Sequence, residues 1–224
     1  MKKIVYFALI VTLLASCKAT KMPTKSVAYK TLYSEKPISI LAMPPINRST
    51  KVEAKELFYS SLSVPFTLNG YYVMPPLLSM EILKEESAYD SEMFINGSMI
   101  KVGELFGVDA VLFTTIHEWS KTSVASQIRV KIEYLLKSTK TNEILFNRVG
   151  QITLQTSVNS GSILVNIVGS MVATALTKEI VVGRSCNIYT ISDIPAGKYS
   201  PMFMKDGEAK SQPKEFKTVL KNSY

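Results

Sequence analysis

Apolar and polar residues alternate most regularly in the middle of the chain. From residue 124 to residue 136 every second residue is apolar, aromatic or small, and Gln, Arg, Lys and Glu hold most of the positions between. The same spacing returns over residues 144–154, after a polar turn at residues 140–142. A period of two is typical of a strand with one buried and one wet face. We therefore predict a long antiparallel hairpin over residues 124–154.

Shorter apolar runs precede the hairpin. The runs over residues 38–43 and 71–74 are each closed by a pair of prolines and predict short strands. Residues 109–116 are apolar almost throughout, which favours a central strand covered on both faces. Apolar residues at helical spacing predict helices between these strands, at residues 54–65, 78–86 and 98–106, the last of them capped by Gly107.

A stretch without charged residues follows the hairpin, from Val149 to Thr177. Its second half, residues 162–177, predicts a helix with a wide apolar face and a second stripe of small residues that lets another backbone approach closely. The stripe consists of Asn166, Gly169, Ser170, Ala173, Thr174 and Thr177. Sixteen uncharged residues interrupted by Asn166 are too few to span a bilayer. The helix is therefore either a core helix or part of a homodimer face, and both interpretations stay open.

These elements together predict an α/β (α+β) fold, in which a mixed sheet with a long antiparallel hairpin is packed with helices. Beyond residue 178 we expect a short strand near residues 187–191. A basic, disordered tail is expected over residues 202–224. The folded part is a single domain over residues 37–201.

The N-terminal residues carry the most specific motif. A basic start at Lys2 and Lys3 precedes an uncharged, mostly apolar run, which ends in Leu14-Ala15-Ser16-Cys17. Small residues before a cysteine form a lipobox, so we predict a signal peptide over residues 1–16 that is cut between Ser16 and Cys17. Cys17 would then carry lipid, including palmitate. In the alternative, the segment is an ordinary secretory signal and the cysteine is incidental.

The net charge and the position of the lysines favour an anionic membrane as a partner. The formal net charge is +8 and falls to +6 without the predicted signal, which removes Lys2 and Lys3. Lysines gather in the predicted lipidated tether, residues 17–36, and in the last twenty residues. Basic segments beside a lipid anchor favour an anionic membrane, at about 1 kcal/mol per residue close to the surface. Nucleic acid is not expected as a partner outside the cytoplasm.

Sorting signals place the expected location at the outer membrane. The residue after Cys17 is Lys18 and not aspartate, which in the common sorting rule indicates the outer membrane. The periplasmic face is favoured over the cell surface. The only other cysteine, Cys186, has no partner within the chain if Cys17 carries lipid, so no internal disulfide is expected.

Catalytic motifs are absent from the sequence. It contains no Gly-rich phosphate loop, no HExxH, no GxSxG and no paired-cysteine zinc signature. The single histidine, His117, is followed by Glu118, and neighbouring residues on a strand point to opposite faces, which argues against a shared metal site. We expect no cofactor, no metal and no enzymatic activity. A hydrolase that uses His117 with Cys186 or a serine remains an alternative.

Five segments closely resemble the uncharacterised bacterial lipoprotein family typified by a genome-derived neisserial antigen. They are the lipobox, Ser39–Ser49, Pro65–Pro75, Gly107–Leu112 and Ile194–Pro201. The chain departs from the family pattern at residues 196–199, where Gly-Pro-Tyr without a lysine is expected. The resemblance implies a fold similar to the TolB amino-terminal domain, related to CsgG and LpoB. It also implies an envelope component that dimerises and serves secretion or assembly, without known enzymatic activity.

The predicted function is that of a non-enzymatic outer-membrane lipoprotein. It would act as a homodimeric scaffold or accessory subunit of an envelope transport, secretion or assembly system, together with envelope proteins that the sequence does not identify. Two alternatives remain. One is a CsgG-like oligomeric export pore, in which the hairpin at residues 124–154 enters the membrane. The other is an LpoB-like activator of a cell-wall enzyme.

Overall fold

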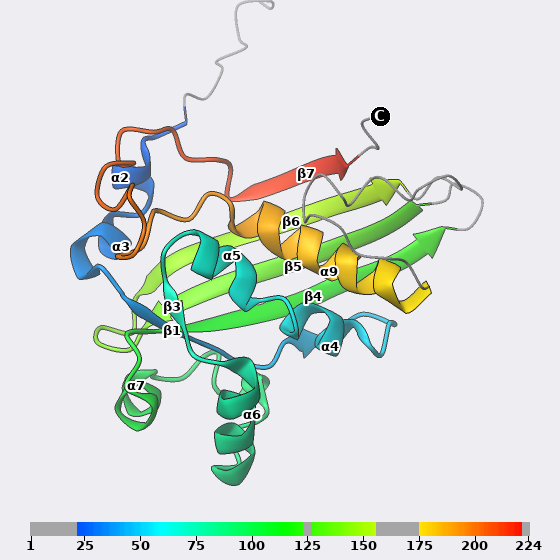
Figure 1. Ribbon diagram of the computed structural model, residues 1–224, viewed down its shortest axis with the longest axis horizontal. Coiled ribbons are helices and arrows are strands. Elements are labelled where there is room, and N and C mark those ends of the chain that lie inside the picture. Colours follow the sequence, from blue (N-terminus) through cyan, green and yellow to red (C-terminus); the bar gives the residue numbers. More distant parts are fainter. Residues whose placement is uncertain (1–21, 123–126, 156–174, 221–224) are drawn as a thin grey trace, which may run out of the picture.

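One mixed sheet forms the centre of the computed structural model, which describes residues 22–122, 127–155 and 175–220 (Figure 1). Its strand order is β3-β1-β4-β5-β6-β7, and β2 pairs with the far part of β4. The strands are β1 (Ser39–Ala42), β2 (Ile46–Asn47), β3 (Tyr72–Val73), β4 (Ala110–Thr122), β5 (Gln127–Ser138), β6 (Ile144–Gln155) and β7 (Glu215–Leu220). The mixed α/β fold predicted from the sequence is confirmed.

The predicted hairpin is the β5–β6 pair. It is antiparallel along its whole length, from the Gln127–Gln155 pair to the Lys137–Ile144 pair beside the turn. Side chains on β5 alternate between buried and outward positions, as the period of two predicted. The predicted central strand is β4, but it continues to Thr122 and pairs antiparallel with β5. The sequence did not predict this second long pairing, because polar residues 117–122 end the apolar run.

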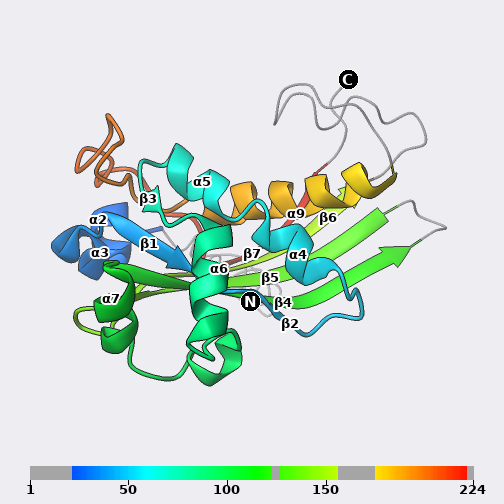
Figure 2. The same cartoon turned by 60° about the horizontal axis from the view of Figure 1, so that its bottom comes forward.

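Helices cover the two faces of the sheet unequally (Figures 1 and 2). Helices α4, α5 and α9 pack on one face, over a core built from alternate residues of β4, β5 and β6. On the other face α6, α7 and a short 3₁₀ helix cover only the part near β1 and β4. The helices are α2 (Lys25–Ala28), α3 (Lys30–Glu35), α4 (Ala54–Tyr59), α5 (Ser63–Leu68), α6 (Pro76–Glu85), α7 (Ile100–Phe106), α9 (Ala175–Ile191) and the 3₁₀ helix η1 (Ser91–Met93).

The strand expected near residues 187–191 is wrong, because these residues form the last turns of α9. The buried face of α9 contains polar residues, so the sequence shows no clear helical period there. Asn187 is fully buried and donates from its amide to the Phe58 carbonyl and the Ser61 hydroxyl, both at 3.0 Å. Its amide oxygen accepts a hydrogen bond from Tyr134 on β5. Polar residues at these positions therefore belong to the helix–sheet contact.

Both predicted flexible ends are also wrong within the described residues. The tether expected over residues 17–36 contains α2 and α3, and Leu32 is buried in the core. The tail expected to be disordered contains β7, which pairs parallel with β6. The two ends support one another, since the backbone of residues 24–26 bonds to that of residues 207–210. The pairing joins segments far apart in sequence, which local patterns do not reveal.

Arg148 is the largest side chain that the body buries completely, with 1% of its surface exposed. It stands on the helix-covered face of β6, and its guanidinium reaches the C-terminal end of α9. There it donates to the carbonyl oxygens of Thr190 at 2.9 Å and Tyr189 at 3.4 Å, and to that of Pro213 at 3.2 Å. A cation at this end of a helix is favourable, because the last carbonyls lack partners within the helix and carry partial negative charge.

The same guanidinium connects both ends of the chain. It donates to the Gln212 side-chain oxygen at 2.5 Å, and the Gln212 backbone amide donates to the Asp193 carboxylate at 2.8 Å. The Tyr29 hydroxyl donates to the same carboxylate, and Arg148 lies over the Phe216 ring at 4.3 Å. A buried charge is tolerated only where hydrogen bonds and an opposite charge compensate it. Arg148 and Asp193 meet that condition together, through segments from both ends of the body.

Asp109 immediately precedes β4 and connects it to the start of β1 and to the hairpin turn. Its carboxylate accepts hydrogen bonds from the Ile38 amide at 2.9 Å and the Ser39 amide at 3.2 Å, and it forms an ion pair with Lys140 at 3.1 Å. Burial acts to raise the pKa of Asp109, but these hydrogen bonds and the lysine outweigh it and lower the pKa. The charged carboxylate thus joins β1, β4 and the hairpin turn.

We expect Asp109→Asn to lower the free energy of unfolding by about 1 to 3 kcal/mol near neutral pH, because charge-assisted hydrogen bonds are lost. A group whose pKa is lowered by folding stabilises above its unfolded pKa, and this stabilisation is lost as the pH falls through the folded pKa. The difference between the variant and the native chain should therefore shrink below about pH 4. Urea unfolding at several pH values measures it. The exposed Glu81→Gln is the control, and a loss from Asp109→Asn that stays equal in acid would contradict the role of the charge.

Arg148→Met should lower the free energy of unfolding by about 3 to 5 kcal/mol, because it removes the buried cation near Asp193 and leaves the Thr190 carbonyl and the Gln212 side chain without their donor. Arg129→Met, on the exposed face of the neighbouring strand, is the matched control and should change stability by less than about 0.5 kcal/mol. The double variant Arg148→Met/Asp193→Asn should lose less than the sum of the single losses. Urea unfolding measures the native protein, the two single variants Arg148→Met and Asp193→Asn, the double variant and the control, and strict additivity would argue against coupling between the two charges.

Candidate functional site

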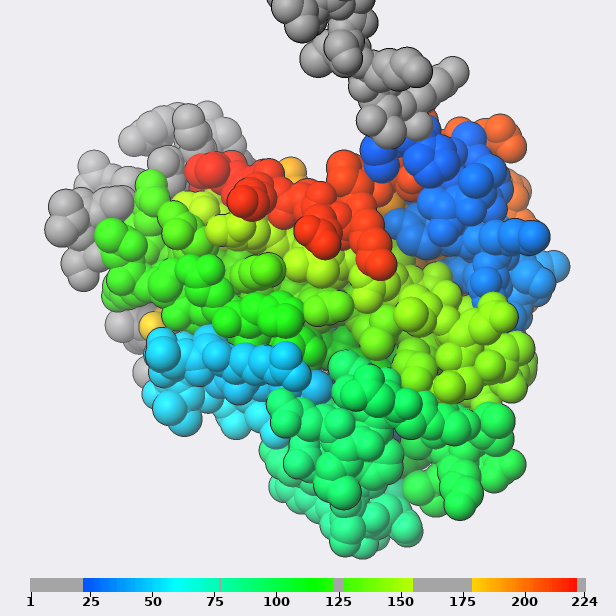
Figure 3. Space-filling model, turned by 180° about the vertical axis from the view of Figure 1, so that it is seen from behind, coloured from blue at the N-terminus to red at the C-terminus, as the bar shows by residue number. Residues whose placement is uncertain are grey.

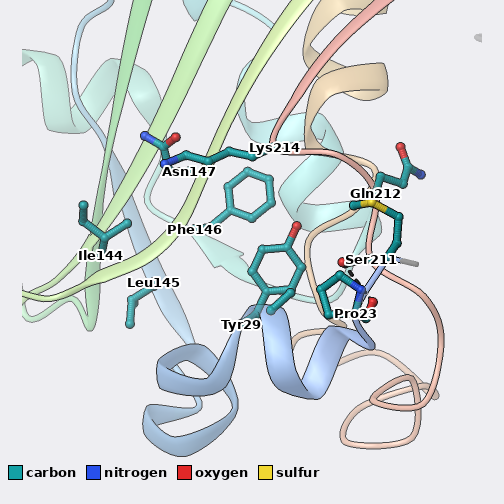
Figure 4. Close-up of a pocket in the computed structure, with 11 residues that line it drawn as sticks. Pro23, Tyr29, Ile144, Leu145, Phe146, Asn147, Ser211, Gln212 and Lys214 are labelled. Carbon is teal, nitrogen blue, oxygen red and sulfur yellow. Dashed lines mark hydrogen bonds between the residues drawn. The ribbon is translucent and has the colours of Figure 1, made fainter. Parts of the chain in front are cut away.

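A pocket lies where the two ends of the body meet (Figure 4). Its volume is about 290 Å³, and its lining comes from the start of β6, from α2 and from the segment that leads to β7. Tyr29 stacks on Phe146 with ring centroids 5.5 Å apart. Burial and the hydrogen bond to Asp193 raise the pKa of Tyr29, so it stays a neutral donor. The polar groups here serve structural hydrogen bonds and do not form an acid–base pair.

The half of the sheet that no described helix covers forms a second surface, the open sheet face. It consists of the outward side chains of β4, β5, β6 and β7, which Figure 3 shows as a continuous band from green to red. Cross-strand neighbours carry opposite or neutral groups, such as Glu118 opposite Lys131 and Arg129 opposite Thr153. Alternating charge of this kind is typical of a solvated face of an antiparallel sheet.

His117 lies on the open sheet face. Its Nε2 is 2.9 Å from a Glu133 carboxylate oxygen, and the other oxygen of Glu133 accepts from the Asn147 amide at 3.3 Å. The expectation that His117 and Glu118 follow the regular alternation of a strand, with side chains on opposite faces, is wrong. A register shift between Ile116 and Glu118 interrupts the alternation. Even so, the described residues contain no group of three or more His, Cys, Asp or Glu side chains that could hold a metal ion.

Cys186 lies far from this histidine in the fold. It is fully buried on α9, within the core on the helix-covered face of the sheet, and burial raises the pKa of its thiol. The sheet therefore separates Cys186 from His117. The structure does not bring together the two side chains that a cysteine hydrolase would need.

Several predicted site residues lie outside the described residues. They are Ser16 and Cys17 of the lipobox and most of the small-residue stripe, Asn166, Gly169, Ser170, Ala173 and Thr174. The backbone of Thr177 belongs to the first turn of α9. In the described part of the chain, no helix has the length and apolar character needed to cross a bilayer.

Arg148, Tyr29 and Asp193 are the structural residues that the sequence interpretation missed. One signal for Arg148 was present. Even-numbered positions of β6 hold the buried residues Phe146, Gly150 and Ile152, and an arginine stands among them. An arginine at a position that the period of two assigns to the core predicts a buried ion. The glycine two residues later predicts that another segment packs closely on this part of the strand. A side chain at Gly150 would indeed meet Phe216 at 2.7 Å.

Comparisons with known proteins agree with the resemblance noted in the sequence. Residues 27–199 match the family described as "Putative lipoprotein GNA1162-like". The chain is 29% identical to lipoprotein NMB1124/NMB1162 of Neisseria meningitidis serogroup B over 138 residues, or 58% of this chain and 63% of that protein. The alignment thus spans less than two thirds of that relative.

Solved structures show the same relationship. The crystal structure of lipoprotein GNA1162 from Neisseria meningitidis matches with a TM-score of 0.52 and 28% identity, over 65% of this chain and 99% of that chain. The C-terminal domain of LpoB from Salmonella enterica matches with a TM-score of 0.34 and 15% identity, over 63% of this chain and 90% of that one. The second likeness is too weak to carry an argument, and the likeness to TolB and CsgG stays a prediction.

The family match covers both the helix-covered core and the glycine turn at residues 196–199. Membership in a family of lipoproteins indicates a protein anchored to a membrane of the cell envelope. The chain belongs to the GNA1162-like lipoprotein family.

Proposed function

We propose that this protein is an outer-membrane lipoprotein, anchored through Cys17, that acts without catalysis as a homodimeric scaffold or accessory subunit of an envelope transport, secretion or assembly system. Family membership is the observation that carries the proposal. The lipobox at residues 14–17 supplies the anchor, and Lys18 after the cysteine supports sorting to the outer membrane. The periplasmic face remains the proposed location of the body.

The short distance between anchor and body supports a positioning role. The described body begins at Met22, five residues after Cys17. Five residues span at most about 18 Å when fully extended. The body would therefore lie close to the membrane surface, and a partner in the same membrane would meet it in a restricted range of orientations.

The placement of the reactive side chains supports a binding role over hydrolysis. His117 bonds to Glu133 on the open sheet face, whereas Cys186 is buried in the core on the opposite face. The apolar face of the β5–β6 hairpin is packed against helices, including α9. That packing favours a folded scaffold over the export-pore alternative, in which the hairpin would enter the membrane.

Replacing Cys17 tests the anchor. We expect Cys17→Ala, secreted behind a signal sequence whose cleavage needs no lipidated cysteine, to fold normally and to leave the membrane fraction after a high-salt wash. The native chain and Cys186→Ala, which changes only the buried cysteine, should stay with the membrane. Fractionation with immunoblotting measures the distribution, and mass spectrometry of the N-terminal peptide measures the lipid. Membrane retention of Cys17→Ala after the wash would contradict the proposal.

The homodimer has its own test. We expect the detergent-solubilised lipoprotein to sediment as a dimer at micromolar concentrations. Gly169→Leu should shift it toward monomer, because a large side chain in the small-residue stripe prevents close approach of a second backbone. Ile180→Leu, at an exposed position of α9, is the control. Analytical ultracentrifugation measures the mass, and a native protein that is entirely monomeric would contradict the dimer.

A further inference from the structure

We infer that one end of the body is a contact surface for anionic phospholipid, so that the anchored protein rests on the membrane in a fixed orientation. This end surface is formed by α2, α3, the α5–β3 turn and the segment at residues 196–210. Its exposed apolar side chains are Val27, Leu68, Tyr72, Tyr199, Met202 and Met204, and its exposed basic side chains are Lys30, Lys36, Lys198, Lys205 and Lys210. The inference rests on the proposed Cys17 anchor.

Backbone hydrogen bonds make the end surface one structural unit. The Lys25 and Ser26 amides donate to carbonyls of residues 209 and 207, at 2.8 and 3.0 Å. The Gly197 and Tyr199 amides donate to the Asn69 and Gly70 carbonyls, at 2.8 and 2.9 Å. These segments lie together at one end of the molecule in both ribbon views (Figures 1 and 2).

Gly70 explains how closely the α5–β3 turn meets the segment at residues 196–210. Its φ is +85°, and a Cβ at this position would lie 2.3 Å from the Ser200 nitrogen. The Tyr71 hydroxyl donates to the Pro195 carbonyl at 2.8 Å, so the buried tyrosine of the pair holds the turn while Tyr72 remains half exposed. The apolar side chains on both segments are thereby held side by side.

The apolar side chains of the end surface are largely exposed to solvent. Leu68 is 74% exposed, Tyr199 69% and Met202 52%. Tyrosine, leucine and methionine side chains that project from a polar body can enter the interfacial layer of a bilayer, where the tyrosine hydroxyl stays hydrated. Other exposed apolar side chains, such as Val52 before α4 and Met93 in η1, belong to segments outside the end surface.

The charges of the end surface match phosphate. None of its five exposed lysines has an ion pair within 4.0 Å among the described residues. The nearby acid Asp206 is already engaged, because it accepts from Lys25 at 3.5 Å, from Tyr33 at 2.8 Å and from the Ala196 amide at 3.0 Å. Glu208 is the one exposed acid within residues 196–210. The remaining positive charge attracts an anionic leaflet, by about 1 kcal/mol for each lysine near the surface.

The anchor emerges at this same end. Pro23 and Thr24 are bonded to residues 210–211, through the Ser211 amide at 2.9 Å and the Thr24–Lys210 bridge. Cys17 lies five residues before Met22, so lipid on that cysteine is at most about 18 Å from the end surface. A second copy of the chain fits less well, because a two-fold contact would place the five lysines against their own counterparts.

A fluorescent probe on the lipidated full chain tests the inference. Cys17 carries the lipid and Cys186 is buried, so a cysteine introduced by Met202→Cys is the one thiol available for labelling with a polarity-sensitive dye. The labelled protein is reconstituted on phosphatidylcholine vesicles with or without phosphatidylglycerol. We expect a blue shift of the emission and quenching by nitroxide lipids that depend on phosphatidylglycerol and weaken with salt. Val52→Cys, 80% exposed in the segment before α4, is the matched control and should show neither.

Replacing lysines of the end surface provides a second test of the lipid contact. Lys198→Gln/Lys205→Gln should lower the vesicle affinity of the end surface about five-fold for each lysine removed, measured as the phosphatidylglycerol content needed for half of the spectral shift. Lys131→Gln/Lys217→Gln on the open sheet face is the matched charge control. An equal effect of both pairs would overturn the inference.

The failure of the anchor is distinguishable from the failure of the surface. A native protein that does not stay on vesicles overturns both. A protein that stays on vesicles but gives the same emission at positions 202 and 52 overturns the end surface alone. A shift at position 202 that follows protein density instead of phosphatidylglycerol would indicate a second copy of the chain and would also overturn the lipid contact.

Discussion

The burial of Arg148 is the constraint on which the arrangement of this body depends. A guanidinium on the helix-covered face of a sheet requires acceptors on several sides, and the chain supplies them from two separate segments, while a third holds the nearby carboxylate. The end of α9 offers carbonyl oxygens, the segment before β7 offers Gln212, and Tyr29 from the N-terminal helices orders the Asp193 carboxylate nearby. If any one of these segments were displaced, a charge would lose its partners inside the core. The cation therefore specifies how the ends of the chain close over the sheet.

The sheet itself follows from a simpler rule. Alternate residues of β5 and β6 are apolar, and this alternation assigns one face to the helices and the other to water. The helix-covered face carries the core, the close contact of Gly183 with the Leu57 carbonyl and the buried Asn187. The open sheet face carries balanced charges. Lysines without ion-pair partners among the described residues, and exposed apolar side chains such as Leu68 and Tyr199, instead lie together at one end, beside the point where the chain continues toward Cys17.

The sequence predicted those parts of the fold that depend on local pattern. The hairpin, the strand at residues 109–116 and the Gly107 cap are visible as periods or as single residues with a fixed conformational role. The C-terminal half of α9 was missed because its buried side includes Ser185, Asn187 and Thr190, which mask the helical period. Strand β7 was missed because it is only six residues long and stands in a lysine-rich stretch, and its partner lies more than sixty residues earlier. The contribution of α2 and α3 depends on partners at the other end of the chain, and composition does not show such partners.

The meeting of the two ends also has a consequence for the order in which the body folds. Ser211 bonds to Pro23 across 188 positions of sequence, and Asp206 pairs with Lys25 across 181. During synthesis residues 22–26 emerge early, whereas the residues that hold them emerge much later. Contacts of such high sequence separation form late in folding, because closing a long loop costs entropy before the contact repays it. The segment at residues 22–26 therefore joins the body late in folding, after most of the chain has been made.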